Sequence, residues 1–266
     1  MSTRLQTSAR QPARLVYIWD LLSVLVSREM KLRYRRSVLG IAWSLLNPLA
    51  QLLVFSLVFR YILPLKIPNY TSFLFAGLLV WDWFQAALLA GTGAIVDNRE
   101  LIRRPGFPLG VLPVVITATH WIHFLLALPI LAGFLLISGV HLSIALLLFL
   151  LPLFVIQFLF TLGLIYFLAA VHVTFRDTQY LLGIGLMLGF YLSPVLYDLS
   201  AVPVRFRAVF QLNPLSILIS AYRDIFLYGT GPDLTALLAL GMVSLGIIAL
   251  GYRLYMHGSS MYMEEL

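Results

Sequence analysis

An all-α integral membrane protein is the fold class that this sequence predicts, and three observations predict it. Of the 266 residues, 61% are hydrophobic and 11% are charged, whereas a soluble domain is roughly a quarter charged. The mean hydropathy is +0.95. The apolar residues also gather in charge-poor windows of about 20 residues or more, the length that a helix needs to cross a bilayer. A water-soluble fold of this size could not bury so much apolar surface.

Residues 1–36 form the first predicted unit, a cytoplasmic N-terminus with an amphipathic interface helix. From residue 15 the apolar residues follow a helical period, and polar residues follow it on the other side, which is typical of a helix lying in the membrane interface. Asp20 interrupts the apolar run and a basic cluster follows it, so a signal peptide is not predicted. The apolar positions are Leu15, Ile18, Leu22, Leu25 and Leu32.

Residues 37–257 form the second predicted unit, a transmembrane domain with six spanning helices. Between the fifth and sixth windows, residues 198–233 hold an apolar stretch that is too short to span and is broken by prolines. We expect one or two short re-entrant helices there, in the outer half of the bilayer. The six windows are 37–59, 70–96, 107–139, 143–174, 178–197 and 234–252.

The distribution of Lys and Arg predicts the orientation. With the N-terminus inside, thirteen of these residues lie in cytoplasmic segments and five lie outside. Because cytoplasmic loops are enriched in positive charge, both termini are expected in the cytoplasm. Residues 97–107 are then a cytoplasmic loop, and residues 258–266 are a cytoplasmic tail.

Four blocks of sequence, in order, resemble the membrane subunits of type-2 ABC exporters that move polysaccharides such as O-antigen and teichoic acid. "REMKLRYRRSVLGIAWSLLNPL" (28–49) resembles the family's approach to the first span, and "YTSFLFAGLLVWDWF" (70–84) its second span. "NRELIRRPGFPLGVLP" (98–113) resembles the cytoplasmic segment after that span. "SPVLYDLSAVP" and "LNPLSILISAYRDIFL" resemble the region between spans five and six. The C-terminal "YMEEL" has no counterpart in this resemblance.

The resemblance implies a half-transporter in the cytoplasmic (inner) membrane of a bacterium. Two copies would form the channel as a homodimer, and two copies of a separate ABC ATPase subunit would bind ATP and Mg. The sequence itself contains no G-x-x-x-x-G-K-[ST] phosphate loop, so no cofactor is expected in this chain and it is not predicted to be an enzyme. The cargo would be a lipid-linked polysaccharide. The net charge of +7 is assigned to topology and membrane lipids, not to nucleic acid.

The resemblance also assigns two sets of cytoplasmic residues. The coupling segment would fit a cleft on the ATPase, with charged residues around an apolar anchor of Leu101 and Ile102; an ordinary positively charged loop is the alternative. A second contact at Arg176 and Asp177 could equally be a helix cap. The coupling residues are Asn98, Arg99, Glu100, Leu101, Ile102, Arg103, Arg176 and Asp177. The interface helix and gate residues are Arg28, Glu29, Lys31, Arg33, Arg35 and Arg36, and a topology signal combined with a surface anchor is the alternative.

The resemblance implies that spans one and five line the channel. Aromatic residues near their outer ends are therefore the predicted sugar contacts, because sugar rings stack on aromatic faces; an interfacial aromatic belt is the alternative. Asp82 is the most notable ionisable residue within a span, with either a functional or a packing role. His120 and His123 lack a third ligand, so no metal site is predicted. Arg223 and Asp224 are expected to stabilise the outer helices. The substrate-channel residues are Phe59, Tyr61, Asp82, Tyr191 and Tyr197.

Three other functions are alternatives to polysaccharide export. A type-2 ABC exporter of drugs or lipids shares the same architecture. A membrane-embedded transferase for polyprenyl-linked sugars needs clustered acidic residues to bind Mg²⁺. The predicted cytoplasmic face has Asp97 with Glu100, and Asp177 alone, so the sequence supports this function poorly. A proton-coupled transporter usually has internal repeats and several intramembrane acids, and neither feature is evident.

Overall fold

The computed structural model describes residues 5–35, 37, 40, 42–63, 65, 67–140, 143–258 and 262, without the side chains of residues 5–15 and 61. In that part of the chain every regular element is helical. The predicted gate residue Arg36 and most of the tail 258–266 lie outside the described residues. The longer helices are α1 (Leu5–Tyr34), α2 (Ala42–Leu57), α3 (Tyr70–Thr92), α5 (Val111–Ile137), α7 (Leu150–Thr174), α8 (Thr178–Leu192) and α11 (Leu234–His257). The shorter ones are η1 (Val58–Ile62), η2 (Val96–Asn98), α4 (Arg99–Ile102), α6 (Ile144–Leu147), η3 (Leu199–Ala201), α9 (Val204–Leu212), α10 (Pro214–Arg223) and η4 (Asp224–Tyr228).

Five helical segments of the described chain are long and apolar enough to cross a membrane: 42–60, 70–92, 111–137, 144–174 and 234–257. They correspond to five of the six predicted windows. The remaining window contains α8, which has 15 residues and is therefore about 22 Å long, shorter than a bilayer core of about 30 Å. It ends before Pro194, because the residue before a proline disfavours helical geometry.

Helix α3 forms the centre of the molecule and packs against α2, α5, α7, α8 and α10. Its side chains are buried around most of the helix, and Phe73, Leu74, Phe75 and Leu78 are fully inaccessible. A helix that is apolar on all sides is stable in a core surrounded by other helices. The sequence places α3 among the spanning helices, and the packing shows that it is the one most enclosed by protein.

Helices α7 and α11 form the most extensive helix pair. Two glycines make this close approach possible. A Cβ atom on Gly163 would lie 2.7 Å from the backbone nitrogen of Ile248, and one on Gly251 would collide with the carbonyl oxygen of Gly163. Small residues at such contacts let helix backbones approach closely in membrane proteins.

Between α8 and α11 the chain forms the short helices α9 and α10, where the sequence predicts one or two re-entrant helices. Asn213 ends α9 and starts α10. Its Oδ1 accepts from the Leu215 backbone N–H at 3.0 Å, and its Nδ2 donates to the Leu192 carbonyl at 3.2 Å. Pro214 occupies the first position of α10, where the missing N–H costs no hydrogen bond.

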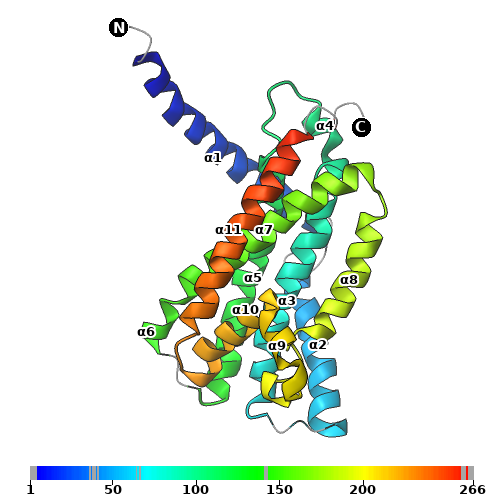
Figure 1. Ribbon diagram of the computed structural model, residues 1–266, viewed down its shortest axis with the longest axis vertical. Coiled ribbons are helices and arrows are strands. Elements are labelled where there is room, and N and C mark those ends of the chain that lie inside the picture. The colour runs from blue at the N-terminus through cyan, green and yellow to red at the C-terminus, as the bar shows by residue number, and fades with distance from the viewer. Residues whose placement is uncertain are drawn as a thin grey trace.

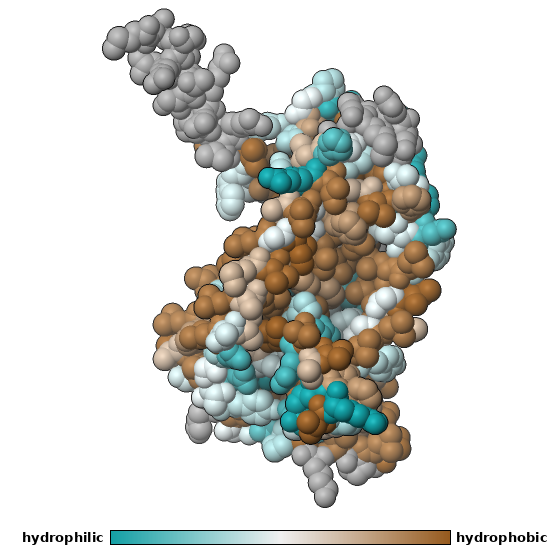
Figure 2. All heavy atoms as spheres, in the orientation of Figure 1, coloured by the Kyte–Doolittle hydropathy of each residue, from teal (hydrophilic) through white to brown (hydrophobic). Residues whose placement is uncertain are grey.

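Figure 1 shows how the chain is distributed along the long axis. The helix α1, the short α4 and the C-terminal end of α11 lie toward one end of the molecule, and α6, α9, α10 and the end of α2 lie toward the other. In Figure 2 the middle of the visible face is mostly hydrophobic, and larger hydrophilic groups lie toward the two ends. This distribution is typical of a protein that crosses a bilayer along this axis.

Candidate functional site

The predicted coupling segment forms η2 and the single-turn helix α4, at the same end of the molecule as α1 (Figure 1). Arg99, Glu100 and Arg103 are exposed there. Leu101 is half-buried and packs beside the contact between α1 and α5. Ile102 is 4% exposed and packs inside the protein's own core. Ile102 therefore holds the segment onto the protein, and cannot serve as an apolar anchor in a partner's cleft in this conformation.

Arg176 and Asp177 are both exposed in the turn between α7 and α8. Asp177 stands at the N-terminal cap position of α8, but its side chain makes no capping hydrogen bond. The alternative that this residue serves as a cap is therefore not supported, and both side chains face outward.

The basic residues of α1 occupy different surfaces. Arg28, Lys31 and Arg35 line a shallow groove along α1. Glu29, with Arg28, faces a second cavity of about 290 Å³ whose other wall includes Asp97 and Asn98 of the coupling segment. The structure thus brings the predicted interface helix and the predicted coupling segment together at one site.

Arg33 does not line the groove formed by Arg28, Lys31 and Arg35; its side chain contacts helix α5. Its Nη2 lies 3.0 Å from Nε2 of His120, and the hydroxyl of the next residue, Tyr34, lies 2.9 Å from Nε2 of His123. His120 Nδ1 lies 2.9 Å from the Ile116 carbonyl, which can only accept. His120 therefore carries its proton on Nδ1, and Nε2 accepts from the Arg33 guanidinium, as a neutral imidazole does. Both Nε2 atoms are engaged, and no group of three metal-ligating side chains occurs among the described residues.

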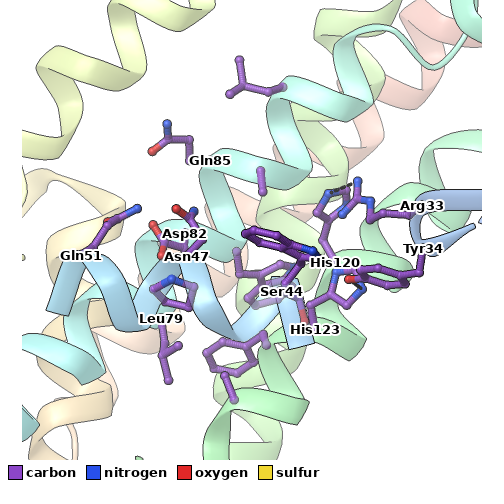
Figure 3. Close-up of a pocket in the computed structure, with 17 residues that line it drawn as sticks. Arg33, Tyr34, Ser44, Asn47, Gln51, Leu79, Asp82, Gln85, His120 and His123 are labelled. Atoms are coloured by element: carbon purple, nitrogen blue, oxygen red, sulfur yellow. Dashed lines mark hydrogen bonds between the residues drawn. The ribbon is translucent and has the colours of Figure 1, made fainter. Parts of the chain in front are cut away.

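A cavity of about 520 Å³ opens where the end of α1 meets α2, α3 and α5 (Figure 3). In Figure 3, Asn47, Gln51 and Asp82 lie on one side of it, and the pairs formed with His120 and His123 lie on the other. Aromatic surface comes from Trp43, Trp83 and Phe124. The polar lining residues are Arg33, Tyr34, Ser44, Asn47, Gln51, Asp82, Gln85, His120 and His123.

Asp82 and Trp83 line this cavity, and each has a buried polar atom without a hydrogen-bond partner. Oδ2 of Asp82 and Nε1 of Trp83 are buried, and neither has a hydrogen-bond partner in the described chain. Buried polar atoms without partners are uncommon in native structures, and ordered water, an ion or a functional role accounts for them. The sequence allows Asp82 either a functional or a packing role. Because Oδ2 has no hydrogen-bond partner in the described chain, packing through a hydrogen bond of this atom is not supported.

The predicted channel aromatics form two groups. Phe59 contacts Phe55, whose ring stacks on Phe190, and the ring of Phe190 meets that of Tyr191 edge-on. This series connects α2 with α8. Tyr197 contacts Phe210 and donates from its hydroxyl to the Tyr191 carbonyl at 2.8 Å. Asp82 lies apart from this series, in the cavity. The Tyr61 side chain lies outside the described residues.

Arg223 is 3% exposed, although it is charged. Its guanidinium donates to three backbone carbonyls, those of Phe73, Pro194 and Val195, at 2.5–3.2 Å. It also lies over the Phe73 ring, 3.4 Å from the ring centroid. This agrees with the sequence-based expectation that Arg223 stabilises the outer helices.

Polar residues of α2 are the part of the site that sequence reasoning missed. Ser44, Asn47 and Gln51 recur at spacings of three and four residues in a span without charge. Such spacing places them on one helix face, so the signal was present. Nothing local to α2 indicates, however, that this face meets Asp82 and the end of α1.

These features define a multi-pass membrane protein with polar residues inside its helical bundle and the charged single-turn helix α4 toward one end. The chain belongs to the ABC-2 type transporter family, whose model matches residues 20–227. It is 43% identical, over 162 residues, to the O-antigen export system permease protein RfbA of Myxococcus xanthus. That alignment covers 60% of this chain and 62% of the relative, so the chain matches less than two thirds of that protein.

Two further relatives come from Klebsiella pneumoniae and carry the same name. They are 32% and 33% identical to this chain, each over 182 residues. Each alignment covers 68% of this chain and 70% of the relative. All three relatives are named as permease proteins, which are membrane subunits of a transporter and not enzymes.

Proposed function

We propose that this chain is the transmembrane subunit of an ATP-driven exporter that moves a lipid-linked, O-antigen-like polysaccharide across the cytoplasmic membrane of a bacterium. Two copies form the channel, and two copies of a separate ATPase subunit bind ATP and Mg²⁺. The observation that carries the proposal is the similarity to three permeases named for O-antigen export, within a match to the ABC-2 family over residues 20–227.

The arrangement of the chain supports six membrane crossings with both termini in the cytoplasm. Helix α1 and the C-terminal end of α11 lie at the same end of the molecule (Figure 1), which requires an even number of crossings. The five longer segments and α8 supply six. Because α8 is short, residues 193–197 complete its crossing, and α9 and α10 then lie at the outer side as re-entrant helices.

The surface of α2 and α8 supports the assembly of two copies. In the window of α2, 11% of the residues are buried, the lowest share among the five segments. On α8, Tyr180, Leu181 and Tyr191 are more than 60% exposed. Exposed apolar faces of this extent are covered by lipid or by another chain, and two copies joined through them would place the aromatic series between α2 and α8 along a shared channel.

The exposed charges of α4 provide the test of ATPase coupling. We expect Glu100→Arg to abolish polymer export in a strain that lacks the native permease, and to lower the ATPase activity that transport stimulates, without changing the abundance of the protein in the membrane. Leu101→Asp should do the same, although its half-buried side chain makes a check of folding necessary. Arg205→Ala is the matched control, an exposed charge on α9 toward the opposite end of the molecule. Normal export by both coupling variants would refute the assignment.

A further inference from the structure

The backbone that follows the coupling segment is held by two tyrosine hydroxyls from distant helices. Tyr166 of α7 donates to the Gly110 carbonyl at 2.7 Å, and Tyr255 of α11 donates to the Leu109 carbonyl at 3.1 Å. The two tyrosines are 4% and 0% exposed. Leu109 and Gly110 lie between α4 and α5. Helices α7 and α11 are therefore both bonded to the stretch that joins the coupling segment to α5.

The stretch between α4 and these two carbonyls contains a tight turn. The Phe107 N–H donates to the Arg104 carbonyl at 3.2 Å. Gly106 has a φ of 78° and follows Pro105, which is the pattern of a type II turn. Because proline fixes its own φ, the turn has little conformational freedom. A displacement of α4 is therefore passed on to the backbone that precedes α5.

Tyr262, in the C-terminal tail, extends this pair of tyrosines to a series of three rings. Its N–H donates to the Gly258 carbonyl at 3.1 Å, which places Tyr262 one helical turn beyond the end of α11. The ring centroids of Tyr262 and Tyr255 lie 5.8 Å apart, and those of Tyr255 and Tyr166 lie 5.1 Å apart with the rings edge-on. Tyr262 is 1% exposed. A residue of the tail thus packs directly on one of the two tyrosines that hold the loop.

The contact of Tyr262 is made by its ring and not by its hydroxyl. The hydroxyl oxygen is buried without a hydrogen-bond partner in the described chain. The ring, by contrast, lies so close to the end of α11 that a Cβ atom on Gly258 would come within 2.7–2.8 Å of three of the Tyr262 side-chain atoms. Gly258 has a φ of −77°, which any residue adopts. Glycine is needed at this position for the space that the ring takes.

The same buried cluster contains Tyr262 and Ile102 of the coupling segment. It lies toward the end of the molecule where α4 and the C-terminal end of α11 meet the eye together (Figure 1). The coupling segment is therefore held at two points, by the side chain of Ile102 within it and by the tyrosine hydroxyls bonded to the backbone after it. Because α7 and α11 form the most extensive helix pair, and packed interiors transmit strain, a force on this loop acts on both helices.

We propose that Tyr262 is a positioning residue for transport. Its ring holds Tyr255 in place, and Tyr255 with Tyr166 holds the backbone after the coupling segment, through which the motion of the ATPase reaches α7 and α11. The proposal rests on the proposed function, because an ATPase supplies the motion. Without the ring of Tyr262 the loop moves independently of the two helices, and ATP hydrolysis is no longer matched by export.

The first test is hydrogen–deuterium exchange of the full-length chain in nanodiscs made of phosphatidylglycerol, without the ATPase. The amides of Phe107, Val111 and Leu112 are the probes, because each donates to a carbonyl of the stretch 104–109. We expect Tyr262→Ala to raise their exchange rates about fivefold, as the loss of one aromatic pair predicts, and Tyr262→Phe to leave them unchanged. Tyr17→Ala, which removes an exposed tyrosine from α1, is the matched control.

Two further variants separate the ring contact from the identity of residue 262. Gly258→Ala displaces the ring of Tyr262 and should raise the same exchange rates as Tyr262→Ala does. In the Tyr262→Ala background it should add nothing, because no ring is left to displace. Gly246→Ala, on the same helix and with nothing within 4 Å of its Cβ atom, is its matched control. Tyr255→Phe keeps the ring and should also raise the exchange rates, because the Leu109 carbonyl loses its donor.

The second test measures transport. Each variant is expressed in a strain that lacks the native permease, and the polymer exported per ATP hydrolysed is measured on the purified complex with its ATPase subunit. We expect Tyr262→Ala to lower this ratio about fivefold at unchanged abundance in the membrane, and Tyr262→Phe to restore it. A residue that only stabilised the fold would change the abundance and leave the ratio as it is in the wild type.

The proposal is overturned if Tyr262→Ala and Gly258→Ala leave the exchange of the three amides unchanged, or if Tyr262→Phe fails to restore the ratio of export to hydrolysis. Surface polymer in the complemented strain tests the proposed function separately. If the wild-type gene restores no polymer, the exporter assignment fails, and the exchange rates still decide whether Tyr262 holds the loop. If the wild type restores polymer and Tyr262→Ala exports as much per ATP, the positioning role alone fails.

Discussion

Arg223 is the residue whose replacement tests most directly how α10 is held against the core. Arg223→Met removes the guanidinium and keeps an unbranched apolar stem. The carbonyls of Phe73, Pro194 and Val195 then lose donors that lie 2.5–3.2 Å away. These carbonyls belong to α3 and to the segment after α8, so the change loosens three parts of the chain at once.

The magnitude follows from the burial of the site. Each hydrogen bond from a charged donor contributes about 1.5–3 kcal/mol, and a buried acceptor left without a donor costs about 1–3 kcal/mol. Met avoids the desolvation cost of a buried cation, which offsets part of this loss. We therefore expect the free energy of unfolding to fall by about 3 kcal/mol, equivalent to a decrease of roughly 5 °C in Tm for a chain of this size.

The assay is the apparent Tm of the purified chain in nanodiscs, with Arg205→Met as the matched control. Arg205 is exposed and lies 4.6 Å from the centroid of the Phe206 ring, a contact that contributes about 0.5–1 kcal/mol at an exposed site. Gly77→Ala adds a second test, because its Cβ atom would lie 2.6 Å from Nη2 of Arg223. In the Arg223→Met background this alanine should cost much less than in the wild type. Equal Tm values for the Arg223 and Arg205 variants, or an unchanged cost of Gly77→Ala, would refute the reasoning.

Two other predictions concern the helix pair and the outer surface. Gly251→Ala should lower the apparent Tm well below that of Gly246→Ala, since a Cβ atom at Gly251 meets the Gly163 backbone and one at Gly246 meets nothing within 4 Å; similar Tm values would contradict the close helix contact. Burial, together with two neighbouring carboxylates, raises the pKa of Asp224 from 3.8 to about 6. The folded protein therefore loses stability as pH rises from about 4 to above 6, by about 1–3 kcal/mol, so Asp224→Asn should raise the apparent Tm at pH 8 and leave it unchanged at pH 4.

The sequence alone predicts the helical membrane class, five of the spanning segments and the break at Asn213–Pro214, because hydropathy, charge and proline act over a few neighbouring residues. The window that holds α8 is longer than the helix itself, because low charge continues to residue 197 whereas the helix ends at Leu192. The sequence also predicts that Ile102 is part of the apolar anchor for the ATPase, whereas the structure buries Ile102 in the protein's own core. The sequence does not distinguish these cases, because an apolar residue in a loop can face either a partner or its own core.

What only the tertiary structure decided is which distant residues meet. Arg33 bonds to His120 across 87 positions of the chain, and Arg223 to Phe73 across 150. No local period encodes these contacts. The sequence determined that Asp82 lies within an apolar helix. The spacing of the polar residues of α2 also fixes them on one helix face, although the sequence-based site prediction leaves them out. Helix packing decided that these two faces enclose one cavity, since burial of the apolar surface of α3 fixes which helices surround it.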